Sequence, residues 1–440
     1  MRIFRTGAFV MLLLLKTLCA SAQTRMIVMT DIGGSDPDDT QSLVHLLVSL
    51  DEVELAGIIS QHAWVPYGTG AVKLINELID GYEKCLPNLR IHNKRFPNAT
   101  YLRSIVKVGQ SEAAVKGIGH GKDSEGSEWI IREVDKKDAR PIWISAWSGL
   151  NTLAQALWKV EHTRSRKELN RFVSKLRVYD VLGQDDAGAW ITNRYPNLIY
   201  IRNSEIYGWA PSDDWIRTNI QNKGILGKLY PDRIWATEGD SPAFMYCLSN
   251  GLNEPEHPEW GGWGGRFETV RKEKMRGMDW VAKNGLDESR HDPYFMIPSS
   301  REGSIGIVKW KNGIYNDFAA RMQWSVSSKY EEANHHPIIF IGKDKTKRII
   351  EKSVDKGTTV TLDASKSYDP DGNAMSYRWM FYREPSSYDG DIIIDKTSES
   401  ICEIYIPEES AGKTIHIVLE VTDDGKPALT SYRRIVLYVQ

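Results

Sequence analysis

Short apolar segments alternate with amphipathic segments through the first 180 residues, and this alternation restricts the fold more than any other feature. The apolar runs, bounded by turn-forming or polar residues, are 26–29, 53–60, 141–147 and 176–182. Apolar side chains at helical spacing fill 40–50, 70–80 and 151–160. The pattern predicts an α/β domain with a mostly parallel sheet flanked by helices. Ligands bind such sheets at the carboxyl ends of the strands, where we expect Asp31, Trp147 and Gly183.

The pattern changes after Pro337. Short alternating strands are predicted at 347–354, 358–362, 376–382, 400–406, 414–421 and 432–439, with turn signals between them. About 100 residues with this rhythm are typical of a small all-β sandwich. The segment 362–379 also resembles PKD-like and other immunoglobulin-like modules. We therefore predict a signal peptide at 1–22, an α/β domain at 23–336 and a β-sandwich domain at 337–440.

The first residues have the composition of an export signal. Arg2 and Arg5 precede an apolar run at 8–15, which is too short to cross a bilayer, and residues 20–22 fit a cleavage site. We expect a periplasmic or secreted protein without a transmembrane segment. The three cysteines that remain lack metal-ligand spacing. We expect buried free thiols at Cys85, Cys247 and Cys402, with one disulfide between two of them as the alternative. A formal net charge of −2 excludes a broad basic surface for nucleic acid.

A cluster of carboxylates follows the first predicted strand. Residues 30–42 read TDIGGSDPDDTQS, and the acidic positions are Asp31, Asp36, Asp38 and Asp39. Gly33 and Gly34 let the backbone turn so that several carboxylates can converge. Carboxylates this close repel one another unless a cation or a proton lies among them, and oxygen ligands without His or Cys favour calcium. Helix capping is the alternative, but a cap needs one carboxylate rather than four.

The strand, acidic turn and helix resemble the opening motif of inosine–uridine-type nucleoside hydrolases. The variant TDIGGSDPDD more closely resembles a nucleoside-hydrolase-like family described as cellulose-binding. Further matching stretches are SEWII at 127–131, WSGLNTLAQAL at 147–157, EGDSPAF at 238–244 and DFAARMQW at 317–324. The resemblance covers roughly residues 24–336, and a β-sandwich tail belongs to the same family architecture.

The resemblance implies a calcium site and a catalytic residue. Asp31 matches the aspartate that binds calcium and activates the attacking water. Asp39 matches the calcium ligand at the end of the motif, with Asp38 or Asp36 beside it. Asp240 matches the distant calcium aspartate. The loop that offers calcium a backbone carbonyl matches the segment around Asn151.

Two departures from the nucleoside-hydrolase pattern change the expected substrate. Gly239 stands where these enzymes often have a histidine that can protonate a departing base. Trp64 lies near the position of a Gly-Asn pair that contacts ribose. A carbohydrate glycoside is therefore a better expectation than a purine or pyrimidine nucleoside.

Several other residues are candidates for binding the substrate. Aromatic rings could stack on a sugar or base, and polar groups near strand ends could line the same pocket. These candidates are Trp64, Trp147, Gln184, Asp185, Asp186, Trp190 and Glu238. Core packing or a surface turn is the alternative for each of them.

The sequence thus predicts a secreted, calcium-dependent hydrolase of N- or O-glycosyl bonds in a nucleoside-like or carbohydrate substrate. The main alternative is a non-catalytic carbohydrate-binding protein that keeps a structural metal site. A third is a surface protein in which calcium only holds loops together. The oligomeric state, including a homo-oligomer, stays open.

Overall fold

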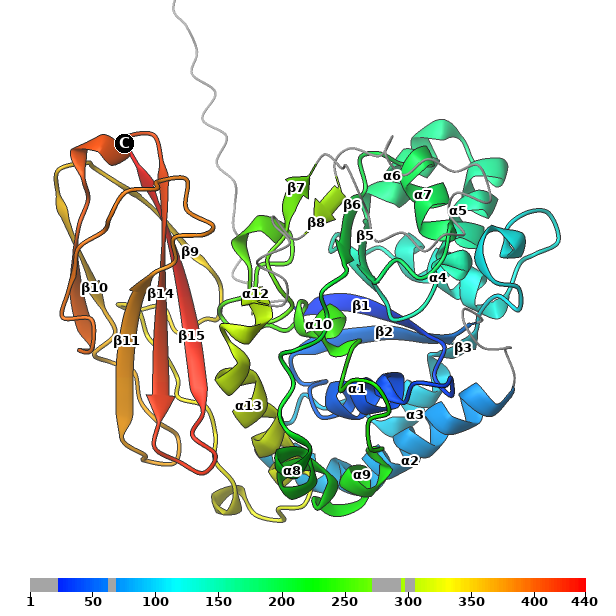
Figure 1. Ribbon diagram of the computed structural model, residues 1–440, viewed down its shortest axis with the longest axis horizontal. Coiled ribbons are helices and arrows are strands. Elements are labelled where there is room, and N and C mark those ends of the chain that lie inside the picture. Colours follow the sequence, from blue (N-terminus) through cyan, green and yellow to red (C-terminus); the bar gives the residue numbers. More distant parts are fainter. Residues whose placement is uncertain (1–22, 62–68, 271–293, 297–304) are drawn as a thin grey trace, which may run out of the picture.

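The computed structural model describes residues 23–61, 69–270, 294–296 and 305–440. It contains an α/β domain followed by a β-sandwich, which lie side by side with helix α13 between them (Figure 1). The predicted fold class is confirmed. The predicted signal peptide at 1–22 and Trp64 lie outside the described residues. No helix in the described part of the chain is long and apolar enough to cross a membrane.

The sheet of the first domain is parallel except at one edge. In the described residues its strands run in the order β3-β2-β1-β4-β5-β6-β8-β7, and β7 is antiparallel to β8. Their bounds are β1 Thr24–Thr30, β2 Val53–Ser60, β3 Val106–Val108, β4 Ile142–Ala146, β5 Leu176–Val181, β6 Ile199–Asn203, β7 Glu268–Val270 and β8 Tyr294–Met296. Strands β1 and β4 are buried along almost their whole length, as their apolar sequences predict.

Helices cover both faces of this sheet because each face of β1 is apolar. Val28 packs in one cluster with residues of α1, α2, α10 and α13, and Met29 packs in a second cluster with residues of α4, α5, α6 and α7. The helix bounds are α1 Asp38–Leu47, α2 Thr69–His92, α3 Ala99–Ser104, α4 Glu125–Asp135, α5 Asn151–Thr163, α6 Arg166–Ser174, α7 Ala187–Arg194, α8 Asp213–Ile216, α9 Gly224–Leu229, α10 Ser241–Met245, α12 Ile305–Val308 and α13 Lys311–Trp324.

The strand order reverses between β1 and β4. The chain moves outward from β1 to β2 and β3, and then returns to place β4 on the other side of β1. In an open parallel sheet this reversal leaves a crevice at the carboxyl ends of the two central strands. Asp31 follows β1 directly and Trp147 follows β4, and the Trp147 amide donates to the Met29 carbonyl at 2.8 Å. The topology therefore places both residues at the crevice.

Two sheets form the C-terminal domain. One has the order β10-β13-β12 and the other β11-β14-β15-β9, and a buried apolar cluster joins their facing sides. The bounds are β9 Ile350–Val354, β10 Thr359–Asp363, β11 Met375–Phe381, β12 Ile394–Asp395, β13 Ile401–Tyr405, β14 Thr414–Asp423 and β15 Thr430–Val439. Cys402 lies in this core, and Cys85 and Cys247 in the first domain; all three are buried free thiols, as predicted.

The second sheet of the sandwich also packs against the α/β domain. The Tyr432 ring meets the rings of Trp263 and Trp310 edge to face, with centroids 6.1 and 5.6 Å apart. Arg434 is fully buried, and its guanidinium donates to the carbonyls of Trp260 and Gly261 at 2.9 and 2.7 Å. The segment from about Glu254 to Arg301 is irregular and rich in Gly, Pro, Trp and charged residues, and on this basis the sequence predicts long loops over the active-site face. That is wrong for its described part around Trp260 and Trp263, because these aromatic side chains contact the sandwich.

A buried ionic network holds α13 in place at this junction. Arg321 donates to Asp317 at 2.7 Å and pairs with Asp51 after α1, and all three side chains are almost fully buried. His336, at the end of the first domain, lies 3.2 Å from the Asp317 carboxylate. The network neutralises charges that would otherwise be costly to bury.

Candidate metal centre

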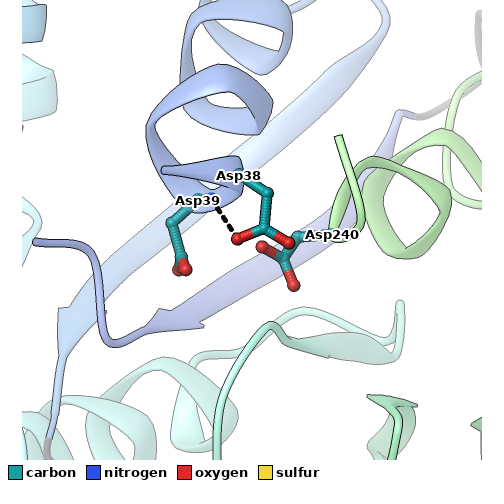
Figure 2. Close-up of side chains that lie close together, drawn as sticks. All are labelled: Asp38, Asp39 and Asp240. Carbon is teal, nitrogen blue, oxygen red and sulfur yellow. Dashed lines mark hydrogen bonds between the residues drawn. The ribbon is translucent and has the colours of Figure 1, made fainter. Parts of the chain in front are cut away.

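The acidic turn brings two aspartates to the start of α1. Thr30 ends β1, Gly33 turns the chain with a φ of +94°, and α1 begins at Asp38. Asp240 comes from a distant part of the sequence. It lies immediately before α10, which packs against α1. Carboxylate oxygens of Asp38, Asp39 and Asp240 all lie within 4.8 Å of one another. Figure 2 shows the three carboxylates gathered beside the first turn of α1.

These carboxylates have few hydrogen-bond donors. The Asp39 amide donates to the Asp38 carboxylate at 3.1 Å, and the Thr30 hydroxyl donates to Asp39. Asp240 is only 2% exposed, and among the described residues its Oδ2 atom has no hydrogen-bond partner. Buried polar atoms without a partner are rare in proteins. The aspartates therefore present oxygen atoms that a bound cation would satisfy.

Burial and mutual repulsion raise the pKa of all three carboxyl groups. Burial raises the pKa of Asp38 to about 7, and the neighbouring charges of Asp36 and Asp31 add to the shift. The pKa of Asp39 and of Asp240 lies well above the usual range, first because of burial and then because of the other aspartates. Ionised together they need a positive charge among them. An oxygen-only donor set of carboxylates fits a hard cation such as calcium.

The three aspartates line a cavity of about 380 Å³ at the crevice between β1 and β4. The lining residues are Asp31, Gly34, Ser35, Asp36, Asp38, Asp39, Trp147, Val181, Leu182, Gln184, Ile206, Tyr207, Trp235 and Asp240. Trp147 is held by a bond from its indole N–H to the Ser145 hydroxyl at 2.9 Å. The Gln184 amide donates to the Trp147 carbonyl at 2.6 Å. The structure thus brings Trp147 and Gln184 to the acidic cluster.

Four of the predicted substrate-binding residues, Asp185, Asp186, Trp190 and Glu238, are not among those that line this cavity. Asp185 is buried and accepts hydrogen bonds from the amides of Leu150 and Ala187, each at 3.1 Å. Asp186 accepts from the Val115 amide at 2.8 Å. The Trp190 ring, on α7, packs beside the Arg194 guanidinium, with its centroid 4.9 Å away.

The predicted calcium ligand Asn151 is the first residue of α5 and is fully buried. Its side-chain amide donates to the Glu112 carbonyl at 2.8 Å. It is likewise not among the cavity-lining residues, so a role for its backbone carbonyl stays a prediction.

The Glu238 carboxylate is hydrogen-bonded to other side chains of the protein and is not among the cavity-lining residues. Its carboxylate lies 2.7 Å from the His45 ring nitrogen and accepts from the hydroxyls of Tyr230 and Ser241, each at 2.8 Å. Its backbone has a φ of +51°, a strained conformation for a residue with a side chain. These bonds hold the turn that directs Asp240 towards α1. We interpret Glu238 as a positioning residue.

Sequence reasoning misses two aromatic residues of the cavity, Tyr207 and Trp235. Both lie in irregular segments, where no strand or helix period marks a side chain as facing a site. A β-carbon added to Gly239 would lie 2.5 Å from the Asp38 carboxylate and 2.8 Å from the Tyr207 ring. A histidine at position 239 would therefore require the Asp38 and Tyr207 side chains to move. Burial and the charge of Asp38 raise the pKa of the Tyr207 hydroxyl.

Two family models match the chain. Residues 25–267 match the family described as "Cellulose-binding Sde182, nucleoside hydrolase-like domain", and residues 359–439 match "Cellulose-binding protein Sde0182, C-terminal domain". No curated protein matches the chain.

Among solved structures, a nucleoside hydrolase-related hypothetical protein from Saccharophagus degradans, described as associated with carbohydrate metabolism, is 42% identical to this chain. The match covers 95% of this chain and 100% of that one, with a TM-score of 0.90. The PKD domain of the KIAA 1837 protein matches 23% of this chain and 85% of its own length, at 21% identity and a TM-score of 0.18.

Proposed function

The chain belongs to the family of cellulose-binding proteins with a nucleoside hydrolase-like domain, and from this we propose that it is a secreted, calcium-dependent hydrolase of glycosidic bonds in carbohydrates. The observation that carries the proposal is the group Asp38, Asp39 and Asp240, which faces the same cavity as Asp31. A structural metal site needs no cavity beside it. This one lies at the crevice where parallel sheets bind ligands.

Asp38, Asp39 and Asp240 would hold the calcium ion, with Asp31 and Asp36 beside them in the cavity wall. When bound, calcium would neutralise this group of carboxylates and favour loss of a proton from a nearby water. The Asp31 carboxylate would accept that proton as the water attacks the anomeric carbon. Negative charge and aromatic rings near that carbon would stabilise an oxocarbenium-like transition state.

The surroundings of Gly239 support a carbohydrate rather than a nucleoside substrate. Position 239 carries no histidine that could protonate a departing base, and a side chain here would require Asp38 and Tyr207 to move. A sugar hydroxyl as leaving group also needs a proton, which solvent water would supply.

The same glycine favours the main alternative, a carbohydrate-binding protein without catalytic activity. In that case the acidic group would hold calcium only to order the walls of the cavity. The two functions differ in what Asp31 does. A base is needed for turnover, but a binding protein can lose it and still bind its ligand.

The test is hydrolysis of a panel of oligosaccharides, aryl glycosides and nucleosides by the wild-type protein and by Asp31→Asn, each with calcium and with EDTA. Asp355→Asn, at an exposed position between β9 and β10, is the matched control. We expect turnover of a carbohydrate that requires calcium and falls at least ~10²-fold in Asp31→Asn, the low end of what a general base contributes. Absence of turnover across the panel, with sugar binding that survives in Asp31→Asn, would support the binding protein instead.

A further inference from the structure

The side chains that line the cavity include two chemical sets. One set is the five aspartates, and the other is apolar and aromatic and comes from the ends of β5 and β6 and from the loop before α10. The members of this apolar set are Val181, Leu182, Ile206, Tyr207 and Trp235. The polar atoms that these side chains carry are one phenol hydroxyl and one indole N–H. The apolar set therefore offers flat apolar surface and few groups that could form hydrogen bonds with the edge of a nucleobase.

Tyr207 and Trp235 are the exposed members of this set. The side chain of Trp235 is 65% exposed and that of Tyr207 is 41% exposed. Tryptophan is usually among the most buried residues, so an exposed indole beside a cavity points to a ligand that covers it. The neighbouring Ile234 is 62% exposed as well, which extends the apolar surface beyond the cavity.

The two ends of the loop that carries Trp235 are connected through one side chain. The Gln41 side chain, on α1, donates to the Pro231 carbonyl at 3.0 Å and accepts from the Glu238 amide at 2.8 Å. One amide group thus fixes both ends of the segment that contains Trp235. Tyr207 lies close to the buried Trp209, whose indole donates to the Ile206 carbonyl at 2.8 Å. Tryptophan and tyrosine side chains have only two rotatable bonds, so covering them with a ligand costs little conformational entropy.

We propose that Tyr207 and Trp235 form a binding subsite for a pyranose ring of a neutral oligosaccharide, whose chain continues out of the cavity to solvent. The flat C–H face of an equatorially substituted pyranose matches an aromatic ring, and its hydroxyls can remain in water. The five aspartates that line the same cavity disfavour an acidic sugar. A cavity of about 380 Å³ is near the small end of ligand pockets, so the solvent-exposed parts of the Tyr207 and Trp235 rings would contact a further sugar unit.

This subsite deepens the proposed function, because it names the neutral oligosaccharide as the substrate class. It concerns binding rather than bond cleavage, so it is tested in Asp31→Asn, where turnover does not interfere. The probes are glucose, cellobiose and cellotetraose, with inosine as the competing class, titrated calorimetrically in the presence of calcium. The variants are Trp235→Ala, Trp235→Phe and Tyr207→Ala. Tyr405→Ala, at an aromatic residue that is 43% exposed on β13, is the control.

We expect affinity to rise from glucose to cellotetraose. Trp235→Ala should weaken cellotetraose about tenfold, the loss that corresponds to one good aromatic contact, while Trp235→Phe retains part of the affinity. Tyr207→Ala should weaken cellobiose and cellotetraose, and Tyr405→Ala should leave every affinity unchanged.

Unchanged oligosaccharide affinities in Trp235→Ala and Tyr207→Ala would overturn the subsite. The subsite would also be overturned if inosine bound in a Trp235-dependent manner while the glucose oligomers did not bind. Absence of binding by both classes of ligand would overturn it as well. The proposed hydrolase fails separately: Trp235-dependent binding in Asp31→Asn together with a wild-type protein that cleaves nothing would refute catalysis and keep the subsite.

Discussion

Asp38→Asn should stabilise the protein in the absence of metal and remove its response to calcium. Asp38 begins α1 and is buried beside Asp39 and Asp240. An asparagine keeps an oxygen that can accept the hydrogen bond from the Asp39 amide, so the helix start is preserved. The substitution removes one of the charges that must otherwise be buried together.

The magnitude follows from the pKa of Asp38, which is raised from 3.8 to about 7 in the folded protein. Between these two values the folded state holds a proton that the unfolded state has lost, so the free energy of unfolding falls as pH rises. The loss is complete above about pH 7, and a shift of about three pH units corresponds to roughly 4 kcal/mol. The same stability is fully present below pH 3.8. Asparagine has no proton to lose, so the variant escapes this penalty.

Urea unfolding in EDTA, followed by tryptophan fluorescence, measures the difference. At pH 8 we expect Asp38→Asn to be more stable than the wild type by several kcal/mol, and at pH 4 the two should be nearly equal. Calcium at about 100 times its dissociation constant should then stabilise the wild type by about 2.7 kcal/mol, and the variant by much less. Asp355→Asn, at an exposed position in the sandwich, should behave as the wild type under every condition.

A variant that is less stable than the wild type in EDTA at pH 8 would refute the reasoning. It would show that the ionised Asp38 carboxylate does not destabilise the folded protein. Equal stabilisation of both proteins by calcium would show that the ion binds elsewhere.

Three further changes test the scaffold around the site. Gly313→Ala should lower the free energy of unfolding by ~1–3 kcal/mol, because a β-carbon there would collide with the Tyr432 hydroxyl. Most of this loss should disappear when Tyr432→Phe is added to the same protein. Additive losses in the double variant would contradict this explanation. Arg321→Met leaves two buried carboxylates without their cation and should cost about 3–5 kcal/mol in urea unfolding, whereas the exposed Arg217→Met should cost less than ~0.5 kcal/mol. Gly239→Ala should weaken calcium binding ~10-fold or more in calorimetric titrations, because the new methyl group meets a carboxylate of the metal centre; unchanged affinity would show that the carboxylate can move away without loss.

The sequence alone predicts much of the first domain, because its signals are local. Buried parallel strands are short apolar runs, and the predicted runs at 53–60 and 176–182 correspond closely to β2 and β5. Strand β6 is missed because Arg202 interrupts its apolar pattern. In the structure Arg202 is buried and paired with Asp180 on β5 at 3.0 Å, a compensation that the sequence pattern does not reveal.

The near-continuous burial of β14 and β15 also needs the tertiary structure for its explanation. A sandwich strand normally alternates between core and solvent. Here Leu437 faces the sandwich core while Tyr432 packs against the α/β domain, so both faces of the sheet are covered.

For the candidate site, the sequence by itself determined that four carboxylates follow the first strand, since a turn keeps neighbouring residues together. The position of Asp240 beside them came only from the family resemblance, and its contact with Asp38 depends on the packing of α10 against α1. Tyr207 and Trp235 reach the same cavity from two separate loops. Loops carry no periodic pattern, and their side chains acquire a direction only when the elements that anchor them pack together.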